Sequence, residues 1–133
     1  MHFSLAYAAL ATVTSLYLSG VVAQTSSCWA PAANVDASYG TLAALRVDTA
    51  VFCNQYATGP AALSSAGRFI FGFQSAAFLG NFASNASCVS TFNTLVTDCY
   101  GTANPNRPVS LGGVRVDPGG AELIISFGNG VKL

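Results

Sequence analysis

Histidine is almost absent from this sequence of 133 residues, because the only one is His2. The stretch from Phe3 to Val22 is mostly apolar and is followed by a small residue, a pattern typical of a secretory signal peptide. We therefore expect a signal peptide over residues 1–23 and one domain over residues 24–133. A mature domain without an imidazole excludes the usual serine and cysteine hydrolase arrangements and a histidine-dependent ribonuclease.

Charged residues are also scarce, at 8% of the sequence, and the five basic and five acidic residues balance. Without a basic patch, neither nucleic acid nor an anionic membrane surface is an expected partner. Uncharged polar residues and glycine must carry the solubility, and such a surface suits neutral partners such as sugars. The sequence has no Cys-x-x-Cys and no Asp-x-Asp pattern, so we expect neither a metal nor another cofactor.

The catalytic chemistry that remains is that of a carboxylate pair, as in a glycosidase. Asp36 is expected to cap a helix and Asp117 to begin a turn, while Asp48 and Asp98 fit charges on helix surfaces. Glu122 is the one further acid. We therefore expect no enzymatic activity.

Four cysteines, all beyond the expected signal peptide, predict two disulfides and a secreted, extracellular protein. Cys88 and Cys99 are expected in one helix, about 16 Å apart, whereas bonded cysteines need Cα atoms within roughly 7 Å. Two pairings remain. We favour Cys53 with Cys99 and Cys28 with Cys88, because this ties together the ends of two expected helices. Asn85-Ala86-Ser87 is an N-glycosylation sequence and predicts a surface position for Asn85.

Apolar residues at helical spacing predict two helices. The first covers residues 36–56, with Asp36 or Ser38 as its cap, and the second covers residues 87–100, with Ser87 as its cap. The expected buried faces are Leu42, Leu45, Thr49, Phe52, Cys53 and Tyr56 in the first helix and Val89, Phe92, Leu95, Val96 and Cys99 in the second.

Four stretches of alternating or continuous apolar character predict strands. Two of them, over residues 68–74 and 77–82, lie between the expected helices. The other two, over 109–116 and 121–127, flank Asp117-Pro118-Gly119-Gly120. Proline presets the first corner of a turn and glycine accepts positive φ, so this pair is expected to form an antiparallel hairpin.

Residues 69–73 and 123–127 are apolar on both faces, which implies a sheet covered on two sides by helices or by a partner subunit. Phe69, Phe71 and Phe73 share one face and are assigned to the core or to a subunit interface. The fold class is therefore α+β, with helices on an antiparallel sheet of about four or five strands. Because an uncovered apolar edge invites aggregation, we also expect a homodimer formed by sheet extension, with a binding pocket near its seam.

The order of cysteines and elements resembles the small secreted glycan-binding proteins, or lectins, of inky-cap mushrooms and their fungal relatives. The resemblance is carried by Cys28, Cys53, the run from Cys88 to Cys99, the Gly112-Gly113 loop and the terminal hairpin. It implies a single-domain α/β/α sandwich and two monomers that share one continuous antiparallel sheet. It also implies recognition of GalNAc- and fucose-bearing oligosaccharides, with toxicity to certain cells. We therefore expect a lectin for neutral oligosaccharides of the GalNAc, GlcNAc or fucose type or for cell-surface glycoproteins.

A lectin site needs an aromatic face for the C–H surface of a sugar and planar groups that bond its hydroxyls. Packing is the alternative role for each aromatic residue, and turns or caps are the alternative for each asparagine. A secreted effector or inhibitor that binds a host protein is the alternative function. The expected glycan-binding residues are Trp29, Tyr39, Tyr56 and Tyr100 as ring faces, and Gln55, Asn104, Asn106 and Arg107, with Asn34, as hydrogen-bonding groups.

Overall fold

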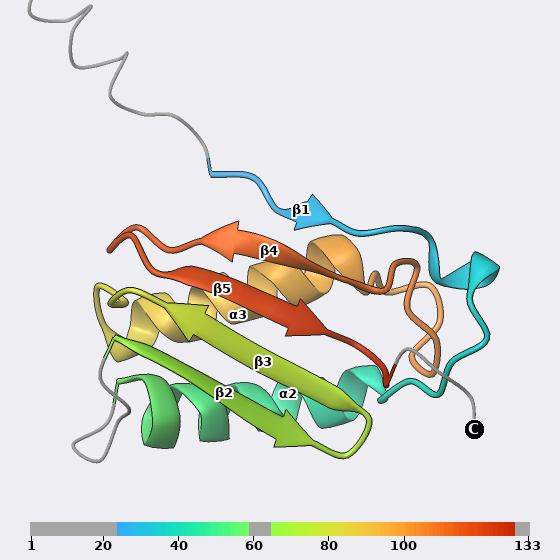
Figure 1. Ribbon diagram of the computed structural model, residues 1–133, viewed down its shortest axis with the longest axis horizontal. Coiled ribbons are helices and arrows are strands. Elements are labelled where there is room, and N and C mark those ends of the chain that lie inside the picture. The colour runs from blue at the N-terminus through green and yellow to red at the C-terminus, as the bar shows by residue number, and fades with distance from the viewer. Residues whose placement is uncertain (1–23, 59–64, 130–133) are drawn as a thin grey trace, which may run out of the picture.

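The computed structural model describes residues 24–58 and 65–129, so the expected signal peptide lies outside the described residues. Five antiparallel strands form one sheet in the order β1-β4-β5-β3-β2 (Figure 1). The α+β class and the strand number are confirmed. The strands are β1 (Ser27–Cys28), β2 (Ala66–Phe71), β3 (Gln74–Leu79), β4 (Gly112–Val116) and β5 (Glu122–Ser126).

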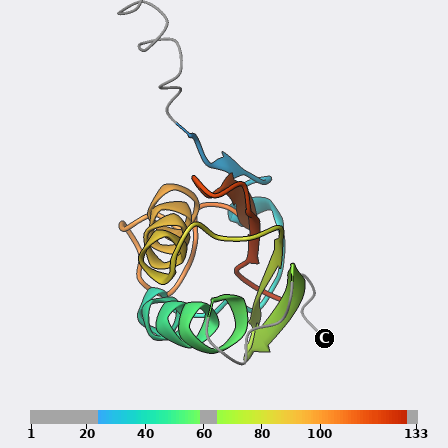
Figure 2. The ribbon, with the colours of Figure 1, turned by 90° about the vertical axis from the view of Figure 1, so that its left-hand side faces the viewer.

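Two helical segments cover one face of this sheet, as the end-on view shows (Figure 2). The first is α2 (Leu42–Val51), which continues as the π-helix η2 (Phe52–Ala57), and the second is α3 (Asn85–Cys99); a short 3-10 turn, η1 (Ala32–Asn34), follows β1. Among the described helices, none has both the length and the apolar character needed to span a membrane.

The outer face of the sheet, opposite the helices, differs from the α/β/α layering that the resemblance implies. The described residues place both helices on the same side, so they form two layers (Figure 2). In β3, Ala76 and Phe78 are buried toward the helices, whereas Ser75 and Ala77 alternate toward the outer face. Ile70 on β2 is 64% exposed. Within the described residues, helices therefore cover one face of the sheet, and cover of the outer face by a partner subunit, the alternative to helices, stays a prediction.

Helix α2 begins later than its sequence pattern suggests. Its N-cap is Thr41, whose hydroxyl accepts a 3.1 Å hydrogen bond from the Ala44 N–H, so neither Asp36 nor Ser38 caps it. The expected buried face is confirmed by Leu45 and Thr49, and it continues into η2 through Phe52. The helix ends where the Thr58 N–H bonds the Cys53 carbonyl at 3.1 Å, in an i to i+5 pattern.

Helix α3 also has a cap that differs from the expected one. Ser84, rather than Ser87, accepts a bond from the backbone, namely from the Ser87 N–H at 3.0 Å. The buried face packs in the core against Phe52, whose ring centroid lies 5.6 Å from that of Phe92. The residues of α3 that are buried are Cys88, Thr91, Phe92, Leu95, Val96 and Cys99.

Both strand pairs are hairpins. The β4–β5 turn is confirmed, with the Asp117 N–H bonded to the Ala121 carbonyl at 2.8 Å. The β2–β3 turn is tighter than expected, because Phe71 pairs directly with Gln74 across Gly72 and Phe73. Gly72 supplies the positive φ, +56°, that such a turn requires. Phe73 therefore lies exposed in the turn and does not share the buried face of Phe71, as the sequence pattern had suggested.

The disulfides are Cys28–Cys99 and Cys53–Cys88, with Cα–Cα distances of 5.3 and 5.8 Å. The exclusion of a Cys88–Cys99 bridge is confirmed, but the favoured pairing is wrong. The first turn of α3 lies beside η2, and its last turn lies beside β1, so each end of the helix meets a different partner. The loops closed span 71 and 35 residues, which corresponds to about 4 kcal/mol of stabilisation each in the chain-entropy treatment.

Candidate binding site beside Trp29 and Tyr39

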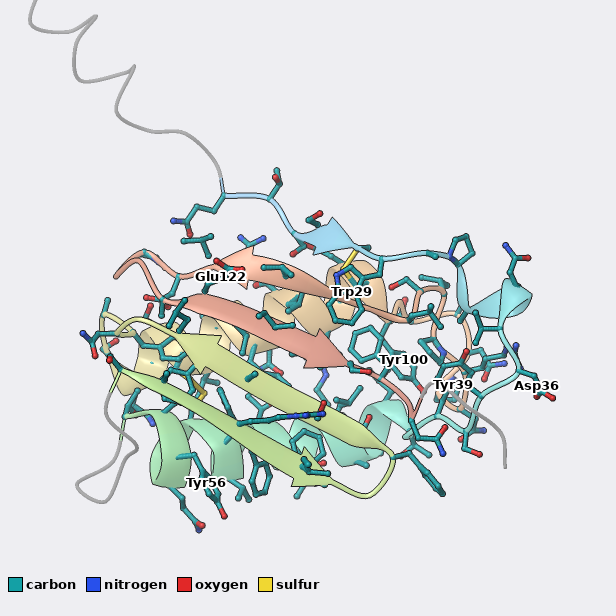
Figure 3. All side chains as sticks on the ribbon, in the orientation of Figure 1. Trp29, Asp36, Tyr39, Tyr56, Tyr100 and Glu122 are labelled. Atoms are coloured by element: carbon teal, nitrogen blue, oxygen red, sulfur yellow. A yellow bond between two sulfur atoms is a disulfide. The ribbon has the colours of Figure 1, made fainter. Side chains whose placement is uncertain are left out.

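A hollow of about 340 Å³ opens where the segment after β1, which contains Trp29, meets the end of β5. Its size falls within the usual range of small-ligand sites. Trp29 lies on the outer side of the sheet over β4, and Tyr39 lies toward the same end of the molecule (Figure 3). The hollow is lined by Trp29, Val35, Tyr39, Leu111, Ser126 and Gly128.

The Trp29 ring is placed by the strand pairing of its neighbours. Cys28 turns toward the helices to bond Cys99, so the next residue turns to the outer face. The Trp29 N–H bonds the Gly112 carbonyl at 2.8 Å. A Cβ atom on Gly112 would lie 2.1 Å from the Ile125 carbonyl oxygen and 2.8 Å from Cζ3 of the indole, so glycine is needed for both β5 and the ring to pack there. The indole is fixed on one side and remains 40% exposed.

The Tyr39 ring is held from two directions. Its hydroxyl lies 3.3 Å from the Ala32 carbonyl and 3.4 Å from the Val35 carbonyl, and it donates to one of them at a time. The guanidinium carbon of Arg107 lies 5.5 Å from the ring centroid, within the range of a cation–π contact. Arg107 also donates to the Ala32 carbonyl at 3.2 Å. The fold thus brings two of the expected glycan-binding residues, Trp29 and Tyr39, into one hollow, and a third, Arg107, lies over the Tyr39 ring without lining the hollow.

Tyr100 has no place in a binding site, because it is only 1% exposed. Its hydroxyl donates to the Gly40 carbonyl at 2.7 Å, and its ring packs edge-on against Phe127 at 5.2 Å. Burial raises the pKa of this phenol. Tyr100 is therefore a core residue that anchors the segment before α2, and the expectation that it presents a sugar platform is wrong.

The remaining expected residues lie outside this hollow. Gln55 and Tyr56 belong to η2, and Figure 3 shows Tyr56 at the lower border of the molecule, away from Trp29, which lies over the sheet. Tyr56 packs on Phe69 with centroids 4.3 Å apart. In the exposed loop after α3, the Asn104 side chain accepts a 2.9 Å bond from the Asn106 N–H. Asn104 therefore stabilises a turn, which was the alternative to sugar binding for this residue. Asn34 is exposed at the end of η1.

Two further hollows adjoin the first. One, of about 390 Å³, shares Tyr39 with it and extends to Asp48 and Phe71. The other, of about 360 Å³, shares Ser126 and Gly128 with the first hollow and Phe73 with the second. Sequence reasoning missed Leu111, Ser126 and Gln74 as lining residues. They come together only through strand pairing, and no local pattern in the sequence marks them.

The acidic residues are dispersed over the described structure. Asp98 forms a 3.6 Å ion pair with Arg115, Glu122 is exposed on β5, and Asp117 is fully buried in a turn. Asp48 is the one acid among the lining residues of the three hollows. Within residues 24–58 and 65–129, no group of three or more histidine, cysteine or acidic side chains is arranged to hold a metal ion.

No family model matches the sequence, and no curated protein matches it either. A function is therefore inferred from the chemistry of the hollow between Trp29 and Tyr39.

Proposed function

We propose that this protein is a secreted lectin that binds neutral oligosaccharides of the GalNAc, GlcNAc or fucose type without hydrolysing them. The observation that carries the proposal is the half-exposed indole of Trp29 at the wall of a concave hollow shared with Tyr39. A sugar ring has one or more faces of C–H groups, which pack against an aromatic ring, and hydroxyls at its rim.

Polar groups near the aromatic walls suit those hydroxyls. Arg107 uses one nitrogen for the Ala32 carbonyl, and a guanidinium has five N–H donors in all. The Ser126 hydroxyl lines the hollow and donates to the Gly128 carbonyl at 3.0 Å, which leaves its oxygen able to accept. An apolar wall with a few oriented polar groups is the usual composition of a small-ligand site.

The disulfides support an extracellular or otherwise oxidising location, in keeping with the proposed secretion. Asn85, the glycosylation candidate, is exposed at the start of α3. Its side-chain nitrogen donates to the side-chain amide oxygen of Asn54 at 2.6 Å and to the Thr58 hydroxyl at 3.0 Å. A glycan attached to this nitrogen would replace one of these two donors and leave one N–H.

The proposed homodimer uses the edge of β2. Residues 123–127, which are apolar on both faces, belong to β5, and β5 lies between β4 and β3, so it offers no edge for sheet extension. At the end of β2, the Gly80 N–H bonds the Ser65 carbonyl at 2.7 Å. In an antiparallel pair, successive residues alternately direct their backbone N–H and C=O groups toward and away from the neighbouring strand. The β2 residues whose backbone groups point away from β3 are therefore Ala66, Arg68 and Ile70. Two β2 strands paired across a two-fold axis would continue the sheet.

A protein-binding effector is the second candidate, and the outer sheet face favours it. Ile70, Leu79 and Val116 are large apolar residues that are exposed there or at its borders. A pull-down with host proteins separates this function from a lectin, because a lectin is displaced by free oligosaccharide and an effector is not.

A glycan array tests the proposal directly. The mature protein is applied to oligosaccharides bearing GalNAc, GlcNAc and fucose, in the presence and absence of free competitor. We expect Trp29→Ala to lose at least about tenfold in affinity, or about 1.4 kcal/mol. Val47→Ala, at an exposed position of α2, is the control and should bind as the wild type does. Equal binding by Trp29→Ala and the wild type would contradict the assigned site.

A further inference from the structure

Asp48 is a carboxylate without a cationic partner among the described residues. It lies half-buried on α2 and lines the second hollow. The ion pair formed within the described part of the chain joins Arg115 to Asp98 instead. Asp48 accepts one long hydrogen bond, 3.4 Å from Nε2 of Gln74. Within the described residues, no cation therefore balances its negative charge.

The nearby basic side chains are engaged elsewhere. Arg46, on the same helix, bonds the side chains of Asn93 at 2.7 Å and Thr97 at 3.1 Å. Arg68 lines the third hollow, and its guanidinium lies 3.5 Å from the Ser75 hydroxyl. Burial raises the pKa of Asp48, and the bond from Gln74 lowers it only in part. A cation that enters the hollow would relieve this unfavourable burial of charge.

Gln74 gives the hollow a fixed polar floor. The side chain is only 3% exposed, and a Cβ on Gly40 would lie 2.1 Å from its Cδ, so the glycine makes room for the amide. With its nitrogen toward Asp48, the amide leaves Oε1 buried without a hydrogen-bond partner in the described structure. Buried acceptors are normally paired. Oε1 itself is enclosed, because a Cβ on Gly40 would lie 2.2 Å from it, so the charged group that the hollow offers a ligand is the Asp48 carboxylate.

The walls of the hollow favour a cation over a neutral donor. Tyr39, Phe71 and Phe73 line it together with Asp48. The faces of aromatic rings carry negative potential and attract ammonium groups. Because the Arg107 guanidinium already lies over Tyr39, Phe71 and Phe73 are the rings that this contact would use. Tyr39 is also a wall of the hollow beside Trp29, so the two hollows suit adjacent units of one ligand.

We propose that the Asp48 hollow binds the free ammonium group of a de-N-acetylated amino sugar. The ammonium contacts the Asp48 carboxylate, and the sugar that carries it continues toward Trp29. That the ligand is a sugar depends on the lectin function proposed above. That the protein recognises an ammonium group depends only on Asp48 and the residues around it.

The test compares a glucosamine tetrasaccharide with its fully N-acetylated counterpart, by calorimetry in low-salt buffer at mildly acidic pH. We expect the wild type to bind the amine form about tenfold more tightly. Asp48→Asn keeps the shape of the side chain and should remove this preference without weakening binding of the acetylated form. Asp98→Asn is the matched control, because it removes the same charge from an exposed site and should keep the preference.

Each outcome decides between the two proposals. Binding of the amine form alone, lost in Asp48→Asn, supports the ammonium site and contradicts the neutral lectin. Binding of both forms with equal affinity, or a preference that survives in Asp48→Asn, overturns the ammonium site and leaves the lectin standing. Binding of neither form overturns the ammonium site and the GlcNAc type of ligand, whereas the GalNAc and fucose types are decided by the glycan array. Circular dichroism of each variant verifies that the fold is retained.

Discussion

The hydroxyl of Thr91 on α3 donates a 2.8 Å hydrogen bond to the carboxylate of Asp117, which begins the β4–β5 turn. Asp117 is 0% exposed and also accepts bonds from Ser87 and from the backbone N–H groups of Ala83, at 2.9 Å, and Gly119, at 2.7 Å. One carboxylate therefore ties the terminal hairpin to the start of α3.

Replacement of Asp117 should destabilise the protein strongly. Asp117→Ala leaves four donors without their acceptor, and we expect the free energy of unfolding to fall by about 3–5 kcal/mol. Asp98→Ala, which removes an exposed acid from an ion pair, should cost less than about 1 kcal/mol. Urea denaturation followed by circular dichroism measures both. Similar losses in the two variants would show that the Asp117 network contributes little.

The pH dependence of stability should follow the same carboxylate. Burial raises the pKa of Asp117, but its four hydrogen bonds outweigh burial and hold the pKa below the ordinary value of 3.8. Its stabilising effect is therefore present above that value and is lost as the pH falls through the lower pKa of the folded state. Asp48 contributes a pH dependence of stability in the opposite direction. Because its pKa is raised in the folded protein, its contribution to stability increases as the pH falls and the carboxylate is protonated.

Acid titrations of variants separate the two groups. The stability difference between the wild type and Asp117→Asn should shrink steadily as the pH is lowered below about 4. Asp48→Asn should be as stable as the wild type, or more stable, at neutral pH. A difference for Asp117→Asn that stays constant in acid would contradict the lowered pKa.

The disulfide pattern can be read from peptides under nonreducing conditions. We expect one linked pair containing Cys28 and Cys99 and another containing Cys53 and Cys88. Removal of the second bridge by Cys53→Ala with Cys88→Ala should lower the free energy of unfolding by about 4 kcal/mol. A Cys53–Cys99 peptide would mean that α3 lies in the opposite direction relative to η2.

The proposed dimer should depend on the β2 edge and not on the outer sheet face. Ile70→Pro removes an outward N–H from β2 and should convert the dimer to a monomer in sedimentation. Leu79→Lys adds a charge to an exposed position of β3, an interior strand, and should leave the dimer intact. A wild-type protein that sediments as a monomer at micromolar concentration would contradict the dimer.

The sequence predicted those elements whose signals are local. Helical spacing identified the buried faces around Leu45 and Phe92, and the Asp-Pro-Gly-Gly turn identified the terminal hairpin. It did not locate the β2–β3 turn, because Phe73 continues the alternation of Phe69 and Phe71 although the chain reverses beside it.

Features that depend on spatial order were harder to predict. The pairing of the cysteines follows from the direction of α3 relative to β1 and η2, which periodicity does not specify. The expectation that Tyr100 is a ring platform failed because its carbonyl partner, Gly40, lies far away in the sequence. The sequence marked each of Trp29, Tyr39 and Arg107 as a candidate but did not predict that they lie near one another. Their proximity depends on the β-bridge between Tyr39 and Gly128 and on the cation–π contact of Arg107 with Tyr39.

Trp29 is the only tryptophan in the sequence, so its fluorescence reports on the proposed glycan site directly. The most direct measurement is a titration of the mature protein with GalNAc-, GlcNAc- and fucose-containing oligosaccharides. We predict a saturable change in the intensity or wavelength of the Trp29 emission, with the same midpoint as binding measured by calorimetry. Glycan binding in calorimetry with an unchanged Trp29 emission, or no binding at all, would contradict a lectin site beside this residue.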